Sequence, residues 1–149
     1  MTSKVKFMPE GYHTITPYLV VRNAGGLIDF LKHVFDAEET ERMQRPDGSL
    51  MHAEVRIGDS VVMMSEATGE NAPLPAMLHV YLEDTDAAYR RALAAGATSL
   101  REPADQFYGD RTAGVQDAFG NQWWMATHIE DMSPEEMQRR AKAQAGQQG

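Results

Sequence analysis

The sequence predicts an α+β fold built from two similar βαβββ modules, and an internal duplication is the main observation behind this prediction. In the first half, a strand-like run at Thr14–Val21 leads into an apolar helical stripe over Leu27–Phe35. In the second half, Met77–Leu82 leads in the same way into a helical pattern over Ala87–Ala95. Strand-like segments and a hairpin of glycine with a polar residue follow each helix. Because one module buries only one face of its sheet, two modules together are expected to form a curved mixed sheet with an internal cavity.

The 149 residues suffice for one domain, and we expect residues 1–149 to form a single domain with two modules and a tail. The first module covers about residues 12–66, and the second covers about residues 77–131. A linker is predicted at residues 67–76, where glycine, asparagine and two prolines cluster. A polar helix is predicted at about residues 133–143.

Each element of the first module has a local signal. Pro17 indicates an edge or bulge position in the first strand. Asn23 is expected to cap the following helix, and Asp36 is expected to end it in a left-handed conformation. Three further strands are predicted at Glu38–Gln44, Leu50–Ile57 and Val61–Glu66.

Leu50–Ile57 alternates between apolar and polar residues. The alternation places one set of side chains on each face of the strand. The apolar face is expected to carry Met51, Ala53, Val55 and Ile57, and the polar face His52, Glu54 and Arg56.

The second module repeats these signals less strongly. Asp84–Asp86 introduces the helix and Gly96 ends it, with a buried stripe predicted at Ala88, Tyr89, Ala92 and Leu93. Strands are predicted at Thr98–Arg101, Thr112–Gln116 and Gln122–His128. Ser133 as N-cap, Pro134 at the first helical position and Glu136 at the third predict the start of the last helix.

Composition excludes several classes of function. Fourteen basic against 22 acidic residues give a net charge of −8, which disfavours nucleic acid as a partner. The chain contains no apolar run of about 18 residues, so no membrane span is expected. Because there is no cysteine, disulfides and thiolate metal sites are excluded. The N-terminus has no apolar signal core, and we expect a cytoplasmic protein.

Six stretches together resemble the vicinal oxygen chelate superfamily, which holds glyoxalase I, bleomycin-resistance proteins and extradiol dioxygenases. Within it, the chain looks most like the PhnB-like branch, over about residues 12–131. The resemblance implies paired βαβββ modules that assemble as a homodimer. It rests on Tyr18–Val21, Ile28–Phe30, Met51–Glu54, Ile57–Met63, Asp105–Arg111 and Asp117–Asn121.

The resemblance also implies where a metal would bind. Metal-dependent members place four ligands, usually His and Glu, on their first, fourth, fifth and eighth strands. Counted from the shared motifs, these positions are Thr16, Met63, Met77 and Trp124. None of the four side chains is a normal ligand of a hard or borderline divalent ion. We therefore expect no metal cofactor at the usual position.

A displaced metal centre is the alternative. His52 and Glu54 share one face of a strand, and His79 offers a third donor. In that reading a divalent ion polarises the substrate, and Glu54 is the candidate catalytic residue that moves a proton. The simpler interpretation is that His52 and Glu54 are polar anchors of a cavity.

The remaining candidates would line a ligand cavity. Tyr18, Phe107, Tyr108 and Trp124 are candidates for an aromatic wall, and Met63 and Met77 for soft lining. Arg111 is a candidate clamp for a carboxylate or phosphate, with pairing to Asp110 or Glu54 as the structural alternative.

Three functions remain open at this point. The first is a metal-free, homodimeric protein of the glyoxalase/bleomycin-resistance type that binds a small molecule, and the acid-rich surface would suit a cationic one. The second is a metal-dependent lyase, isomerase or dioxygenase that uses the displaced site. The third is an accessory module that docks on a protein through the helix after Ser133.

Overall fold

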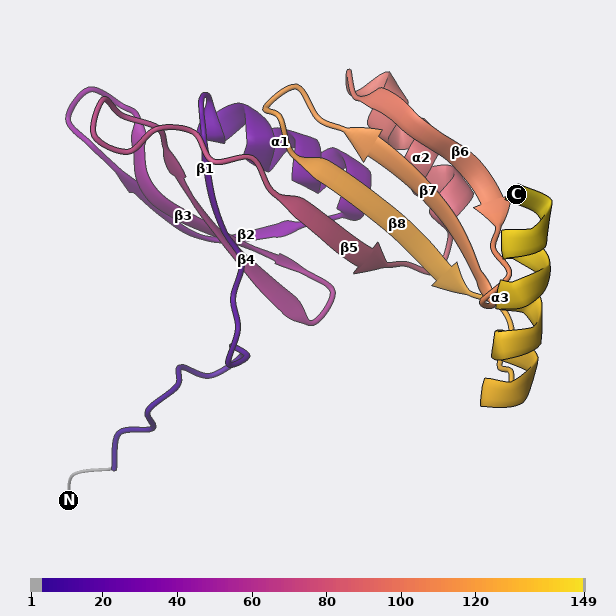
Figure 1. The fold of residues 1–149 in the computed structure, drawn as a ribbon. Helices are drawn as coiled ribbons and strands as arrows, with labels where there is room; N and C mark the ends of the chain where they lie inside the picture. Colours follow the sequence, from indigo (N-terminus) through magenta and orange to yellow (C-terminus); the bar gives the residue numbers. More distant parts are fainter. Residues whose placement is uncertain (1–3, 149) are drawn as a thin grey trace. The chain divides into compact units, whose positions relative to one another are not determined.

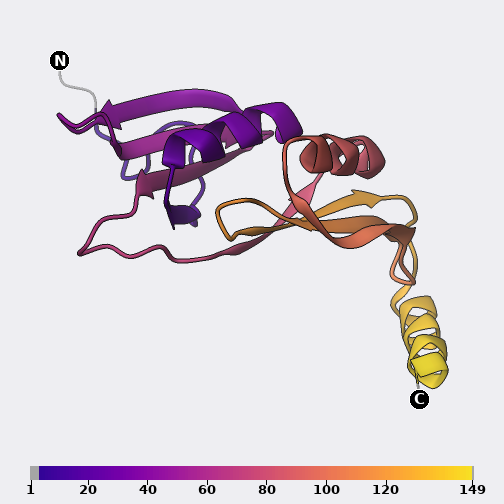
Figure 2. The same ribbon diagram turned by 90° about the horizontal axis from the view of Figure 1, so that it is seen from above.

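The computed structural model describes residues 4–148, and this part of the chain divides after Ala76 into two compact units. Each unit contains one four-stranded mixed sheet with a helix against one of its faces (Figures 1 and 2). Each unit also follows the order strand, helix, strand, strand, strand. The predicted α+β class of βαβββ modules is therefore confirmed, with each module forming a sheet of its own. No helix within residues 4–148 has the length and apolar character needed to cross a membrane.

The sheet of the first unit has the strand order β1-β4-β3-β2. Strand β1 runs parallel to β4, whereas β3 is antiparallel to both β4 and β2. The elements of this unit are β1 (Tyr18–Val21), α1 (Ala24–Phe35), β2 (Glu38–Gln44), β3 (Leu50–Ile57) and β4 (Ser60–Glu66).

Helix α1 supplies the core of the first unit. It contacts all four strands of its sheet, and the side chains of Leu27, Ile28 and Leu31 are fully buried. The opposing strands contribute Val55 and Met64, which are fully buried as well. Each buried aliphatic side chain of this size contributes about 1.5–3 kcal/mol. The face of the sheet opposite α1 is therefore free to carry polar residues.

The ends of α1 follow the predicted caps. Asn23 adopts a left-handed conformation with φ of 69°, and its side chain accepts a hydrogen bond from the Gly26 N–H at 3.0 Å. The Glu66 carboxylate accepts hydrogen bonds from the N–H groups of Asn23 and Ala24. Asp36 ends the helix with φ of 55°. The strand after α1 is therefore redirected without a glycine.

The sheet of the second unit has the strand order β5-β8-β7-β6, with β5 parallel to β8. In the same sheet, β7 pairs with β8 on one side and with β6 on the other, in both cases antiparallel. The elements are β5 (Met77–Tyr81), α2 (Thr85–Ala94), β6 (Thr98–Asp105), β7 (Asp110–Gln116), β8 (Gln122–His128) and α3 (Pro134–Gln148).

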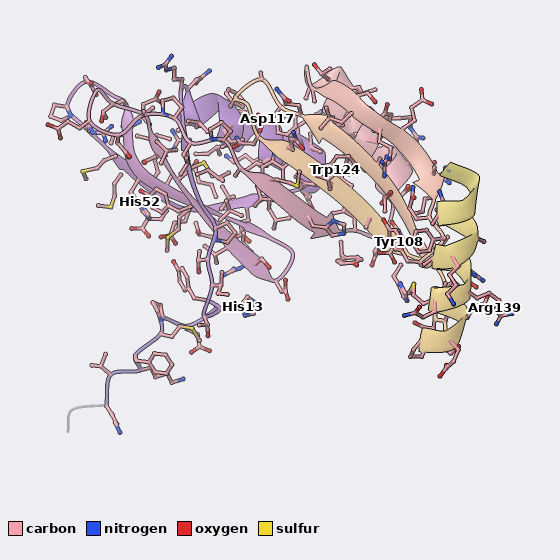
Figure 3. The ribbon with its side chains drawn as sticks, viewed as in Figure 1. His13, His52, Tyr108, Asp117, Trp124 and Arg139 are labelled. Atoms are coloured by element: carbon pink, nitrogen blue, oxygen red, sulfur yellow. The ribbon has the colours of Figure 1, made fainter. Side chains whose placement is uncertain are left out.

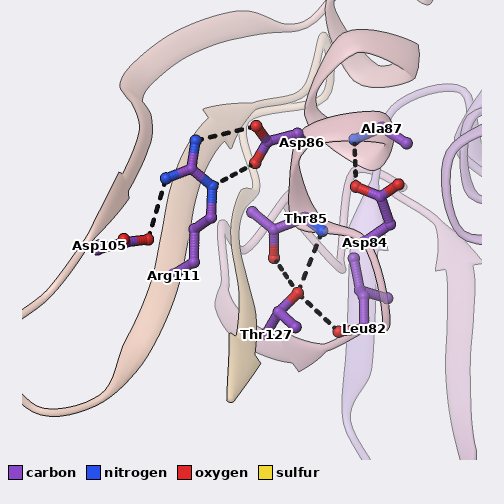
Figure 4. Close-up of polar contacts among 8 residues, drawn as sticks. All are labelled: Leu82, Asp84, Thr85, Asp86, Ala87, Asp105, Arg111 and Thr127. Carbon is purple, nitrogen blue, oxygen red and sulfur yellow. Dashed lines mark hydrogen bonds and ion pairs between the residues drawn. The ribbon is translucent and has the colours of Figure 1, made fainter. Parts of the chain in front are cut away.

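A threonine pair ties the start of α2 to β8 (Figure 4). The Thr127 hydroxyl donates to the Leu82 carbonyl at 2.8 Å and lies 2.9 Å from the Thr85 hydroxyl. The Asp84 side chain caps the helix by accepting from the Ala87 N–H at 3.0 Å. These contacts align α2 with one face of its sheet.

Several predicted boundaries were wrong, and the first strand is the clearest case. The strand was predicted at Thr14–Val21, but β1 begins only at Tyr18. Pro17 has no N–H to donate, and its carbonyl accepts from the Met63 N–H at 2.9 Å. The residues before Pro17 therefore leave the sheet.

The second unit also differs from the prediction in places. Leu93 is 38% exposed, so it does not belong to the buried stripe, whereas Tyr89 is buried and donates to the Ser99 hydroxyl at 2.7 Å. Strand β6 continues past Arg101 through Pro103, which an edge strand tolerates. Strand β7 and helix α3 are likewise longer than predicted.

Candidate functional site

A cavity of about 500 Å³ lies in the first unit, beside the face of the sheet opposite α1. The N-terminal segment forms one wall, and strands β2, β3 and β4 each contribute one side chain. Among the described residues that line the cavity, two are carboxylates and none is lysine or arginine. The lining consists of Phe7, Met8, Pro9, Tyr12, His13, Thr14, Thr16, Glu41, Glu54 and Met63.

Strand register brings three of these side chains into one row. Glu54 on β3 pairs with Met63 on β4 and with Glu41 on β2. The pleat of β3 turns Ala53 and Val55 toward α1, so Glu54 faces the opposite side. The alternation predicted for this strand therefore decides that Glu54 reaches the cavity.

Glu54 is the centre of a hydrogen-bonded cluster. Only 4% of the surface of this residue is exposed, which is unusual for a residue with an ionisable side chain. The Tyr12 hydroxyl donates to one carboxylate oxygen, and His52 Nε2 lies 2.7 Å from the other. The Tyr18 hydroxyl lies 3.4 Å from His52 Nδ1, and the two rings are 5.7 Å apart. In Figure 3, His52 extends from β3 and His13 from the N-terminal segment.

These contacts keep the carboxylate ionised. Burial raises the pKa of Glu54, but the hydrogen bonds from Tyr12 and His52 outweigh it, so the pKa lies below its ordinary value. The same bond to Glu54 raises the pKa of Tyr12 to about 12. At neutral pH the cavity therefore has a buried negative charge and a neutral phenol.

One cluster in this unit has the composition of a metal site. Glu41, His52 and Glu54 each offer one ligand atom, and these atoms lie within 4.8 Å of one another. His79, the third donor expected from the sequence, belongs to the second unit, where its ring packs 5.1 Å from the ring of Tyr81. Within the first unit, Glu41 supplies the third donor.

The four positions that metal-dependent relatives use are divided between the two units. Thr16 and Met63 line the cavity of the first unit. Met77 lies on β5 with 68% of its surface exposed, and Trp124 lies on β8. A hydroxyl, two thioethers and an indole do not form a donor set that fits a hard or borderline divalent ion.

The other candidate residues lie in the second unit. The rings of Phe107 and Tyr108 meet edge to face with centroids 5.2 Å apart. The Phe107 carbonyl accepts from Arg140 of α3 at 3.3 Å. Figure 3 places Tyr108 near α3.

Arg111 forms ion pairs within the protein, which was the structural alternative to a ligand clamp, but its partners are not the expected ones. Its guanidinium makes two bonds to Asp86, at 2.7 and 2.9 Å, and one to Asp105 at 3.0 Å (Figure 4). Asp110 and Glu54 are not among these partners. Because Asp86 belongs to α2, Arg111 lies on the helix-covered side of its sheet and is committed to these carboxylates.

Sequence reasoning missed Tyr12 and Glu41. Tyr12 lies in a segment without regular structure, and no local pattern predicts its contact with a residue on β3. Glu41 lies on a predicted strand, but its place beside Glu54 depends on the register between β2 and β3, which includes a shift between Glu39 and Glu41.

Comparison with known proteins gives one family. The model of the Glyoxalase/Bleomycin resistance protein/Dioxygenase superfamily matches residues 11–125. An uncharacterized protein of Mycobacterium bovis is 34% identical over 141 residues, which cover 87% of this chain and 93% of that protein.

Solved structures show the same fold. TioX from Micromonospora sp. ML1 is similar with a TM-score of 0.65 and 24% identity, over 77% of this chain and 98% of TioX. A PhnB protein from Bacillus cereus, described as a putative 3-demethylubiquinone-9 3-methyltransferase, is similar with a TM-score of 0.65 and 18% identity. That match covers 77% of this chain and 99% of the other.

Proposed function

Because the chain belongs to the glyoxalase/bleomycin resistance protein/dioxygenase superfamily, we propose that it binds a small organic cation, without a metal ion, in the cavity of its first unit. The observation that carries this proposal is the buried, ionised Glu54 at a cavity lined by aromatic and thioether side chains. Binding of this kind requires affinity and no chemical step.

Electrostatics favours a cation as the ligand. A buried carboxylate is stabilised by a charged partner, and Tyr12 and His52 supply hydrogen bonds to Glu54 rather than a lysine or arginine charge. Glu41 adds a second negative charge to the lining. The net charge of −8 steers cations toward the protein over longer distances.

The lining suits an organic ion. Phe7 and Tyr12 present aromatic rings, whose faces attract ammonium groups, and Met8 and Met63 adapt to an irregular apolar shape. The lowered pKa also makes Glu54 a weak base, which supports a role as an anchor rather than as a proton acceptor.

Calorimetry with benzylammonium and phenethylammonium, in the presence of a chelator, tests this proposal. Glu54→Gln keeps the shape of the side chain but removes its charge, so we expect at least about a tenfold loss of affinity. Glu70→Gln, an exposed residue of the same unit, should bind like the parent protein. Because Glu54 has a lowered pKa, the affinity for these ammonium ions should remain unchanged as the pH falls to about 5. Equal affinity in Glu54→Gln and the parent would reject the proposal.

The triad of Glu41, His52 and Glu54 supports a second candidate, a metal-dependent lyase, isomerase or dioxygenase. A divalent ion there would act as a Lewis acid on substrate oxygens, with the three side chains as its ligands. Elemental analysis and titration with zinc or manganese separate the two candidates. Glu41→Gln should weaken metal binding at least about tenfold, whereas it should weaken ammonium binding less than Glu54→Gln does. Metal content that is unaltered in Glu41→Gln and His52→Ala would exclude this site.

The same proposal includes a homodimer, as the family resemblance suggested, and a cytoplasmic location. Sedimentation equilibrium measures the first, and cell fractionation measures the second.

A further inference from the structure

The N-terminal segment of the first unit, residues 4–11, forms a wall of the cavity and yet is almost entirely in contact with water. We call this segment the strap, and in Figure 1 it leads away from the sheet of its unit. Its two largest exposures among apolar residues are those of Phe7, at 97%, and Val5, at 90%. Phe7 belongs to the lining of the cavity, whereas Val5 does not. An aromatic side chain left in water beside a partly apolar cavity has surface that a ligand can bury.

The strap is attached to the sheet only at its C-terminal end. Within residues 4–148, no hydrogen bond or ion pair joins the strap to a strand or a helix, and the ion pair that it contains lies wholly inside it. The attachment comes with the next two residues. The Tyr12 hydroxyl donates to Glu54, and His13 Nε2 lies 3.0 Å from the Asp59 carbonyl. A segment without bonds to the rest of its unit moves at low cost in free energy.

A turn at the attached end provides a hinge. The Tyr12 N–H donates to the Pro9 carbonyl at 3.3 Å, and Gly11 within this turn has φ of 87°. Glycine adopts this conformation without strain, and a Cβ atom here would lie 3.0 Å from the Arg56 guanidinium. The stretch from Phe7 to Gly11 reaches up to about 13 Å when extended, and a cavity of about 500 Å³ is about 10 Å across. A rotation at the turn is therefore sufficient to carry Phe7 across the cavity.

We propose that the strap closes over the cavity when an organic cation binds, and that Phe7 determines a preference for cations that carry an aromatic ring. This inference rests on the cation site proposed above and extends it to the choice of ligand. The ammonium group meets Glu54, and the Phe7 ring covers the apolar part of the ligand. Burial of the two rings favours the closed form, whereas the loss of conformational freedom in the strap opposes it. Closure therefore requires a ligand that offers apolar surface to Phe7.

Calorimetry with benzylammonium and methylammonium, in the presence of a chelator, separates the two parts of the ligand. Methylammonium is measured by its displacement of benzylammonium. The parent protein should bind benzylammonium at least about tenfold more tightly than methylammonium. Phe7→Ala should weaken the binding of benzylammonium about fivefold and leave that of methylammonium unchanged. Val5→Ala is the matched control, because Val5 is also exposed but lies outside the lining, and it should bind both ions like the parent.

Amide hydrogen exchange measures the closure itself. Saturating benzylammonium should slow the exchange of residues 5–11 at least about threefold in the parent protein. Methylammonium should not slow it, because it offers no ring to Phe7. In Phe7→Ala, benzylammonium should leave the exchange of the strap unchanged. The exposed turn at residues 46–48 is the internal control, and its exchange should not respond to either ion.

The outcomes distinguish failure of the strap from failure of the cation site. Parent-like binding of benzylammonium by Phe7→Ala would overturn this inference, and so would unchanged exchange of the strap in the liganded parent. Either result leaves the cation site untouched as long as Glu54→Gln weakens the binding of both ammonium ions. A parent protein that binds neither ion would reject the cation site and the strap together.

Discussion

His128 Nδ1 lies 2.7 Å from the carboxylate of Asp110, a buried acid on the neighbouring strand. The other ring nitrogen lies 2.7 Å from Asp131, just before α3. Asp110 also accepts from the Tyr81 hydroxyl at 3.0 Å. The His128 ring between two carboxylates therefore connects the end of β8 to the segment just before α3.

This relationship predicts a pH dependence of stability. The hydrogen bond to Asp110, and then that to Asp131, raises the pKa of His128 above the ordinary value of 6.5. A pKa raised on folding contributes stability that is complete below pH 6.5 and is lost as pH rises through the folded pKa. The difference in thermal midpoint between the parent and His128→Gln should therefore shrink as the pH rises from 6.5 through the raised pKa of His128. His33→Gln on the exposed side of α1 is the control, and a difference that does not vary with pH would contradict the assignment.

Gly109 is predicted to be far less tolerant of substitution than Gly48. Both have positive φ, 94° and 88°, but a Cβ at Gly109 would collide with the Glu130 carbonyl, whereas nothing lies near Gly48. Gly109→Ala should therefore reduce the free energy of unfolding by about 3 kcal/mol or more, and Gly48→Ala by about 1 kcal/mol. Urea denaturation measures both, and equal losses would show that the close contact is not present in solution.

Asp117 is a buried acceptor in the turn before β8, and Figure 3 shows it near the start of that strand. It accepts from the N–H groups of Phe119 and Asn121, from the Asn121 side chain and from the Trp123 indole. Asp117→Ala leaves these donors without this carboxylate and should reduce the free energy of unfolding by about 3–5 kcal/mol. Asp59→Ala, in the exposed hairpin of the first unit, should change it by less than about 0.5 kcal/mol. Chemical denaturation of the two variants tests the contrast.

The N-cap of α1 predicts an order of effects. Asn23→Gly keeps the left-handed conformation but loses the hydrogen bond to the Gly26 N–H. Asn23→Ala loses the bond and is strained at φ of 69°. We expect losses of about 0.5 kcal/mol for Asn23→Gly and about 2 kcal/mol for Asn23→Ala. Thermal unfolding should give this order, and the reverse order would mean that residue 23 is not held in the left-handed conformation in solution, because both variants lose the cap bond.

The predictions that succeeded concern features set by neighbouring residues. Strands β2, β3 and β8 have the predicted bounds, because alternation and turn residues act over a few positions. Asn23 and Ser133 cap their helices as expected, the latter by accepting from the Glu136 N–H at 3.1 Å. The predicted start of the first strand was wrong, because Pro17 can only accept a hydrogen bond from β4 through its carbonyl. The predicted length of β6 was wrong, because β6 lies at the edge of its sheet, where a proline is tolerated.

The candidate site was only partly accessible from the sequence. His52 and Glu54 were identified because a strand puts positions two apart on one face. The sequence did not identify Tyr12 and Glu41. Tyr12 contacts its partner from an irregular segment, and Glu41 lies beside its partner from a neighbouring strand, where the register decides which residues meet.

Order of elements, caps, and the choice of which side chains face away from each helix were determined by the sequence alone. They depend on hydrophobic spacing and backbone preference, which act between near neighbours. Only the tertiary structure decided that Glu54 would be buried beside Tyr12 and that Glu41 would line the same cavity. Contacts of this kind join residues distant in the chain, and strand pairing with its local shifts selects them.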